Sequence, residues 1–137
     1  MSSLVLVDSS VVVEALNADG RNWAVDLLRD LGRSRIALWD LLIGEILVGA
    51  LDEAEFARVG HYLGQFTNLP PPTDVWGRAG RLGFELKRKD RTVKLADLAT
   101  AVVAMDHGVP IVHRDQHYIE IAKVCDLEQE FVEPDDE

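Results

Sequence analysis

Short runs of apolar residues alternate along this chain with longer stretches in which apolar residues recur at helical spacing. The short runs predict buried strands at residues 2–7, 35–38, 110–113 and 127–132. The longer stretches predict helices at residues 9–16, 21–32, 40–51, 53–66, 74–89, 95–107 and 115–123. Such alternation is typical of an α/β domain, in which a short, mostly parallel central sheet is flanked by helices.

Breaks between these elements fall at residues that end helices or bend the chain. Residues 17–20 and Gly108 each follow a predicted helix, and the three prolines at 70–72 form the clearest interruption. Asp40 stands before an apolar stretch and is expected to cap the helix that follows it. The elements are therefore short and closely connected.

The length of 137 residues, without a repeat or a long linker, indicates a single domain. We expect residues 1–132 to form that domain and residues 133–137 to form an acidic tail. Cys125 is the only cysteine, so no internal disulfide is possible, which fits a reducing compartment. No basic leader precedes the first apolar run and no run reaches membrane-spanning length, so a cytoplasmic location is expected.

Four acidic residues stand where the surrounding residues are apolar. Asp8 ends the first predicted strand and Asp115 follows the third, whereas Glu45 interrupts an apolar helix and Asp97 begins a nearly uncharged one. The carboxyl ends of parallel strands share one edge of a sheet, so Asp8 and Asp115 are expected to project there together. Periodicity alone does not place Glu45 and Asp97 at that edge.

Carboxylates are rarely buried without a partner, and no lysine or arginine lies within these apolar runs. If the four acids converge, their repulsion would protonate some of them unless a cation is bound. Mg²⁺ or Mn²⁺ suits ligation by oxygen and can activate water for phosphodiester hydrolysis. Ser9 or Ser10 could hydrogen-bond a metal-bound water or a phosphate, or simply cap a helix.

Each acid also has a purely structural interpretation. Asp8, Asp97 and Asp115 could each be a helix N-cap, and Glu45 could face solvent. His113 flanks Asp115, as does His117, but a zinc site usually needs three or four nitrogen or sulfur ligands, so zinc is not expected.

The net charge of −10 argues against broad, charge-driven binding to nucleic acid. The charge is uneven, however, because residues 78–94 carry seven of the 14 basic residues. This stretch could hold the phosphates of a substrate, or it could be a solvated helix face. Aromatic residues such as Trp76 and Phe84 stand among apolar neighbours and are expected to pack in the core or an interface, not to stack on bases.

The four acids lie in segments that resemble the motifs of PIN-domain ribonucleases. Residues 7–11 (Val-Asp-Ser-Ser-Val) resemble the opening strand motif, and residues 42–46 resemble the second motif with its glutamate. Residues 95–101 resemble the third motif, and residues 112–118 resemble the fourth. The order and spacing match the small single-domain members, and the similarity is greatest to VapC-type toxins, the ribonuclease half of bacterial toxin–antitoxin pairs.

The resemblance implies an endoribonuclease that uses Mg²⁺ or Mn²⁺ to cut structured RNA such as tRNA or ribosomal RNA. It also implies a homodimer and a cognate antitoxin whose C-terminal segment blocks the acidic cleft. A hydroxyl after the first aspartate commonly assists, so Ser10 is placed with the acids among the expected catalytic residues. The metal ligands implied are Asp8, Glu45, Asp97 and Asp115.

Two positions depart from the family pattern. His113 stands where threonine or serine is more usual, and Asp40 stands where a small capping residue is commoner. Neither change removes an expected metal ligand. His113 could alter protonation in the cleft and thereby the pH dependence of activity.

Two other functions are compatible with parts of the pattern. A phosphoryl-transfer enzyme or a receiver domain also places an aspartate after its first strand, but Ser10 stands where a haloacid-dehalogenase-type phosphatase has a second aspartate. A receiver's acidic pair near the N-terminus is not evident either. A PIN-like binding module without catalysis would lack one or more of the acids, and all four are present.

Overall fold

The computed structural model describes residues 3–132. Its centre is a sheet of five parallel strands in the order β3-β2-β1-β4-β5, which confirms the predicted α/β class. The predicted acidic tail, residues 133–137, lies outside the described residues, as does Ser2 at the predicted start of the first strand. The strands are β1 (Val5–Val7), β2 (Ile36–Leu38), β3 (Thr67–Asn68), β4 (Ile111–His113) and β5 (Gln129–Phe131).

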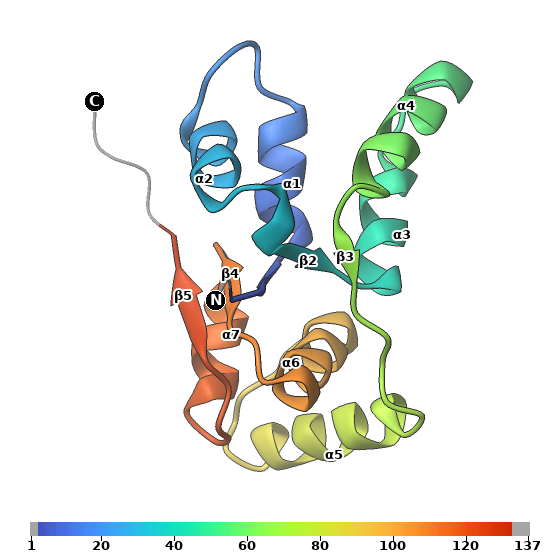
Figure 1. Ribbon diagram of the computed structural model, residues 1–137. Helices are drawn as coiled ribbons and strands as arrows, with labels where there is room; N and C mark the ends of the chain where they lie inside the picture. The colour runs from blue at the N-terminus through green and yellow to red at the C-terminus, as the bar shows by residue number, and fades with distance from the viewer. Residues whose placement is uncertain (1–2, 133–137) are drawn as a thin grey trace.

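Helices cover both faces of the sheet, with α1 and α2 on one side and α5 and α6 on the other (Figure 1). None of the helices within residues 3–132 has the length and apolar character needed to cross a membrane. The α-helices are α1 (Ser9–Leu16), α2 (Trp23–Leu31), α3 (Asp40–Val48), α4 (Glu53–Leu63), α5 (Val75–Lys87), α6 (Leu95–His107) and α7 (Gln116–Ala122), and a 3-10 turn, η1 (Arg33–Arg35), precedes β2.

The strand β3 was not predicted. The apolar pattern predicts a helix at 53–66, but α4 ends at Leu63 and the chain then pairs with β2, Ala37 opposite Thr67. Both residues of β3 are polar and exposed, so they carry no apolar signal of a strand. The strand forms through its pairing with β2, beside which it is the edge strand of the sheet.

Asp40 does not cap α3, which corrects the expectation from the sequence. Trp39 occupies the N-cap position, and Asp40 is the first helical residue, where its carboxylate accepts a hydrogen bond from the Asn68 amide at 2.9 Å. Trp39 is buried, and its indole N–H donates to the Thr100 hydroxyl at 3.1 Å. This contact with α6 fixes the start of α3.

The order of the strands creates a switch point between β1 and β4. From β1 the chain passes to β2 and β3 on one side, and later to β4 and β5 on the other. β1 and β4 are in register, Leu6 opposite Ile111 and Val7 opposite Val112. In open α/β sheets such a point, beyond the carboxyl ends of the strands, is where ligands bind. The residue after β1, Asp8, leaves the sheet there.

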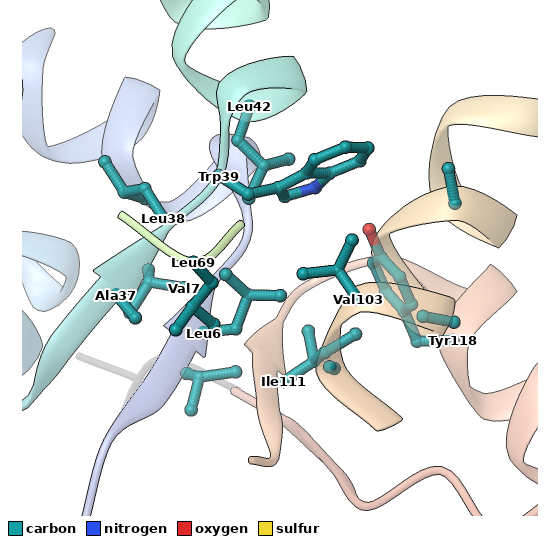
Figure 2. Packing of buried hydrophobic residues seen from close by; sticks show 14 of the residues in the cluster. Leu6, Val7, Ala37, Leu38, Trp39, Leu42, Leu69, Val103, Ile111 and Tyr118 are labelled. Atoms are coloured by element: carbon teal, nitrogen blue, oxygen red, sulfur yellow. The ribbon is translucent and has the colours of Figure 1, made fainter. Parts of the chain in front are cut away.

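The hydrophobic core includes residues on both faces of the sheet, and α6 is buried at every position from Asp97 to Ala104. A helix that is apolar on all sides is typical of the centre of a domain. Tyr118 of α7 is also fully buried, and Figure 2 shows its ring beside Val103 with the hydroxyl directed away from Ile111. That hydroxyl brings a polar atom into the region where the sheet ends.

Candidate functional site

Asp8 lies between the end of β1 and the start of α1. One carboxylate oxygen accepts hydrogen bonds from the Ser10 backbone N–H at 3.2 Å and the Ser10 hydroxyl at 2.8 Å, so Asp8 is the N-cap of α1. The other oxygen accepts a hydrogen bond from the Tyr118 hydroxyl at 2.7 Å. Capping does not explain this second bond, because Tyr118 comes from α7 at the far end of the chain.

Asp97 is the third residue of α6 and not a cap, since Lys94 holds the N-cap position. Its Oδ2 lies 2.9 Å from Nδ1 of His117, and its Oδ1 lies 3.3 Å from the Tyr118 hydroxyl. The residue is only 6% exposed. Tyr118 therefore joins Asp97 of α6 to Asp8 of β1.

Asp115 is the N-cap of α7 and accepts a hydrogen bond from the His117 backbone N–H at 2.9 Å. Its Oδ1 also lies 3.4 Å from Nδ1 of the His117 ring. Possible ligand atoms of Asp97, Asp115 and His117 all lie within 4.8 Å of one another. This group of three side chains has the separation that a single metal ion needs.

Glu45 approaches the site from α3 and is exposed. Its Oε1 accepts a hydrogen bond from the Ser9 hydroxyl at 3.0 Å. Ser9 directly follows Asp8, so Glu45 lies at the border of the site. The structure thus links Asp8, Asp97 and Asp115 through shared partners, whereas Glu45 is connected to them through Ser9 and lies outside the group of three possible metal ligands.

The surroundings of Asp97 disfavour the charged form of its carboxyl group. Burial raises the pKa of Asp97, the hydrogen bond from His117 opposes this, and the charge of Asp115 raises the pKa again. Lys94 lowers the pKa of Asp97 and Asp8 raises it, both to a smaller extent. Within residues 3–132, none of the four acids forms an ion pair with a lysine or arginine.

A divalent cation would resolve this excess of negative charge. The donors present are carboxylate oxygens and one imidazole nitrogen, a set that Mg²⁺ and Mn²⁺ accept and that lacks the several nitrogen or sulfur donors of a zinc site. The Asp/His cluster is consistent with a metal site.

His113 stabilises the cluster through a hydrogen bond with the backbone of Asp115. The ring is fully buried, and its Nδ1 accepts a hydrogen bond from the Asp115 backbone N–H at 3.0 Å. Nε2 therefore carries the proton and donates to the Gln129 side chain, 2.6 Å away. Burial lowers the pKa of His113, whereas its hydrogen bond to Gln129 acts in the opposite direction. His113, the departure from the family pattern, thus holds the backbone of Asp115.

Two residues that the sequence did not assign to the site are central to it. Tyr118 carries no sequence signal, because a tyrosine within an apolar helix is expected to pack in the core. The sequence suggests His117 only as a possible zinc ligand, because its contact with Asp97 joins residues twenty positions apart. Both follow Asp115 closely, so the first turn of α7 supplies much of the site.

Arg114 adjoins Asp115 in sequence, but its side chain is directed elsewhere. Its guanidinium lies 5.3 Å from the Trp23 ring centroid and 5.6 Å from that of Phe131. Arg78, at the start of the basic stretch, pairs with Asp106. Neither arginine contacts the acidic cluster.

The chain is similar in sequence to known proteins. Residues 5–124 match the PIN domain family. The chain is 31% identical over 129 residues to the protein named Ribonuclease VapC11 of Mycobacterium tuberculosis, covering 91% of this chain and 96% of that relative. It is 30% identical over 137 residues to Ribonuclease VapC21 of the same organism, covering 96% of each.

Solved structures show the same fold. VapBC2 from Rickettsia felis, in complex with a DNA fragment from its promoter, superimposes with a TM-score of 0.76 at 18% identity, covering 95% of this chain and 99% of that chain. VapBC-5 from Mycobacterium tuberculosis, a member of the VapBC family of toxin–antitoxin systems, gives a TM-score of 0.69 at 22% identity, with the same coverage.

Proposed function

The chain belongs to the PIN-domain family and is of the VapC ribonuclease type, and on this premise we propose that its acidic cluster hydrolyses RNA phosphodiester bonds with Mg²⁺ or Mn²⁺. It is the toxin component of a toxin–antitoxin system. The proposed metal ligands are the acids that the sequence singled out, namely Asp8, Glu45, Asp97 and Asp115.

One observation carries the proposal. The hydroxyl of Tyr118 and the ring of His117 connect three carboxylates from β1, α6 and α7 at the switch point of the sheet. These acids lack a lysine or arginine partner within residues 3–132. Asp8 and Asp97 are buried and Asp115 is half-buried, so gathering them without a lysine or arginine is costly, and a bound divalent cation would offset that cost.

A bound Mg²⁺ or Mn²⁺ would activate a water and stabilise negative charge on a phosphoryl oxygen. Around the metal, the residues of this chain have separate tasks. Tyr118 holds Asp8 and Asp97 at a fixed separation, and His117 holds Asp97 against Asp115. Glu45 is exposed and can turn toward a substrate or the metal.

The serines after Asp8 divide their hydrogen bonds between the two sides of the site. The hydroxyl of Ser10 donates to Asp8, and the hydroxyl of Ser9 donates to Glu45. In the proposed site Ser10 orients Asp8, and Ser9 restrains the exposed Glu45. Both serines thus act on ligands directly.

Cleavage of RNA by the purified protein tests the proposal. We expect cleavage with Mg²⁺ or Mn²⁺, loss of cleavage with EDTA, and loss in Asp8→Asn and Asp97→Asn. Asp30→Asn, on the outer part of α2, is a matched control because it removes an exposed carboxylate by the same substitution. Full cleavage by the Asp8 and Asp97 variants would rule out the proposed mechanism.

A cognate antitoxin is the proposed protein partner, since the solved neighbours of this fold include toxin–antitoxin complexes. An apolar groove of about 420 Å³ between α1, α2 and α4 offers a surface for it. Suppression of cleavage would come from a C-terminal segment of the antitoxin that blocks the acidic cleft, as the family resemblance implies. Co-expression with the cognate antitoxin, followed by size-exclusion chromatography, tests for the complex.

We also propose a homodimer. Large apolar side chains are exposed on α5 and at the α3–α4 junction, with Trp76 50% exposed, Val48 86% and Leu51 88%. Association would remove part of this surface from water. Light scattering at micromolar concentration should give twice the chain mass of 15.2 kDa, and a monomeric mass would contradict the proposal.

A further inference from the structure

The segment at residues 87–94, called the basic segment below, joins α5 to α6 and carries five basic residues and one acidic residue. Seven of the 14 basic residues of the chain form ion pairs within residues 3–132. Four of the other seven lie in the basic segment, namely Lys87, Arg88, Lys89 and Lys94. Positive charge without a carboxylate partner is thus concentrated in one place on a chain of net charge −10.

The basic segment runs beside α7 toward the acidic cluster. Arg88 and Lys89 line a groove of about 440 Å³ with Val124 and with Glu85, whose carboxylate pairs with Arg81, just beyond the end of α7. Arg91 forms an ion pair with Glu120 in the middle of α7. Lys94 holds the N-cap position of α6, three residues before Asp97. In Figure 1 the chain accordingly leaves the end of α5 and rises to α6.

The distance from the basic segment to the acidic cluster is short. The seven residues of α7 span about 10 Å, and the first turn of α7 lies at the acidic cluster. A nucleic acid strand that follows the basic segment would therefore arrive at the proposed catalytic site after a few nucleotides.

Phe84 adds an aromatic surface at the start of this path. The residue is 51% exposed, although the sequence predicts that it packs. The guanidinium groups of Arg81 and Arg88 lie 5.5 Å and 5.6 Å from the centroid of its ring. An exposed ring beside arginines is an arrangement on which nucleic acid bases stack.

We propose that the basic segment and Phe84 bind a single-stranded part of the RNA substrate, with the cations on phosphates and the ring stacked on a base. This inference rests on the proposed ribonuclease function. RNA fits the surface better than an acidic peptide does, because a nucleotide supplies a planar group and an anion together. Most of the chain repels RNA, so this segment also orients the strand.

Binding of RNA to the metal-free protein in EDTA tests the inference without cleavage. The probe is a fluorescein-labelled, unstructured RNA oligonucleotide, followed by fluorescence anisotropy over a range of salt concentrations. The double substitution Arg88→Ser with Lys89→Ser should make the slope of log affinity against log salt less steep by about 1.4, since each phosphate contact on a single strand contributes about 0.7. Phe84→Leu should weaken binding about tenfold with little change in slope, because stacking is not an ionic interaction.

The matched control removes two positive charges elsewhere. Arg21→Ser with Arg29→Ser breaks two ion pairs with Asp26 that are remote in sequence from the basic segment. We expect the control to leave the salt slope within about 0.3 of the unsubstituted protein, because it removes no phosphate contact. Thermal unfolding checks that each variant folds. If Arg88→Ser with Lys89→Ser does not fold, Lys87→Ser with Lys89→Ser replaces it, with the same expected change in slope.

Equal RNA binding by the segment variants and the control would overturn the inference. It would also fail if the substitutions weakened binding of a labelled polyglutamate peptide and left RNA binding unchanged, because the segment would then recognise an acidic protein. Cleavage by the unsubstituted protein with Mg²⁺ is measured separately. Absence of cleavage would contradict the proposed function, whereas the metal-free binding data decide this inference.

Discussion

Asp97 and Glu45 are both carboxylates on helices of the proposed site, but their surroundings differ. Asp97 is 6% exposed and contacts both His117 and Tyr118, which hold it from two directions. Glu45 is exposed, and its contact with the site is a hydrogen bond from Ser9. The site thus has a buried side, formed by β1, α6 and α7, and an exposed side, formed by α3.

This difference indicates which carboxylate destabilises the folded protein when it is charged and no cation is bound. Burial raises the pKa of Asp97, so the carboxylate form destabilises the folded protein when no cation is bound. Glu45 is solvated and carries little such cost. Metal binding should therefore stabilise the fold mainly through the buried side, whereas the exposed side supplies a ligand that can move.

The largest expected difference between the two sides comes from removing one charge on each. Asp97→Asn and Glu45→Gln should each lower RNA cleavage by more than about 100-fold, the upper end of losses seen for groups that merely support a metal ligand. In EDTA, Asp97→Asn should raise the melting temperature by about 4 °C, because it removes a buried charge. Glu45→Gln should change the free energy of unfolding by less than about 0.5 kcal/mol. Cleavage rates and thermal unfolding measure the two effects.

Equal shifts in melting temperature for the two variants would remove the distinction between a buried and an exposed side. The control Asp30→Asn should change neither cleavage nor stability, because Asp30 is an exposed residue of α2. A loss of cleavage in that control would point to a general effect of charge on RNA binding.

Tyr118→Phe should have the next largest effect, confined to the buried side. The substitution removes the hydroxyl that donates to Asp8 at 2.7 Å, which should lower the free energy of unfolding by about 2 kcal/mol, as for a hydrogen bond to a charged group. Mn²⁺ affinity, measured by titration calorimetry, should fall about 10–100-fold. Tyr62→Phe is the matched control, since Tyr62 is half-buried in α4 and remote from the acids.

The four acids were also unequal as objects of prediction. Asp8 and Asp115 could be placed from the sequence, because each follows a strand and parallel strands end at a common edge. Asp97 lies inside α6, and its approach to the edge depends on how α6 packs across the sheet. Apolar surroundings marked Asp97 and Glu45 in the sequence, and the resemblance to a family implied that they join the other acids, which periodicity could not show.

Supporting residues escaped prediction for a physical reason. Tyr118 and His113 are buried at 0% exposure, and an apolar neighbourhood looks the same in sequence whether a polar group within it has a partner or not. The strand β3 escaped because its pairing with β2 is a tertiary contact made by two polar residues. Contacts across elements, unlike periodicity within one, leave no local signal.

The pH dependence of stability should report on the buried side. Burial lowers the pKa of His113 below its ordinary value of 6.5, so below that pH the unfolded chain binds a proton that the folded chain resists. The free energy of unfolding in EDTA should therefore fall as the pH drops below about 6.5. The raised pKa of Asp97 acts in the opposite direction, since the folded state then binds a proton more readily than the unfolded state.

His113→Asn separates these two contributions. Its side-chain oxygen can still accept the Asp115 backbone N–H, as asparagine does in turns, but it does not titrate. The variant should be less stable by about 1–3 kcal/mol because of the smaller side chain, and its stability should depend less on pH between about 5 and 6.5. Chemical denaturation at several pH values measures both, and an unchanged slope would show that His113 is not the titrating group.

The smallest expected effects come from the two adjacent serines, which make the comparison within one turn of α1. Ser10 donates to the buried Asp8 and Ser9 donates to the exposed Glu45. Ser10→Ala should lower the free energy of unfolding by about 1 kcal/mol, because a buried carboxylate loses a donor, whereas Ser9→Ala should cost less than about 0.5 kcal/mol, since water replaces the lost bond. Mn²⁺ affinity should follow the same order. If Ser9→Ala proved as costly as Ser10→Ala, Glu45 would be held as firmly as Asp8, and the exposed side would be a fixed part of the site instead of an adjustable one.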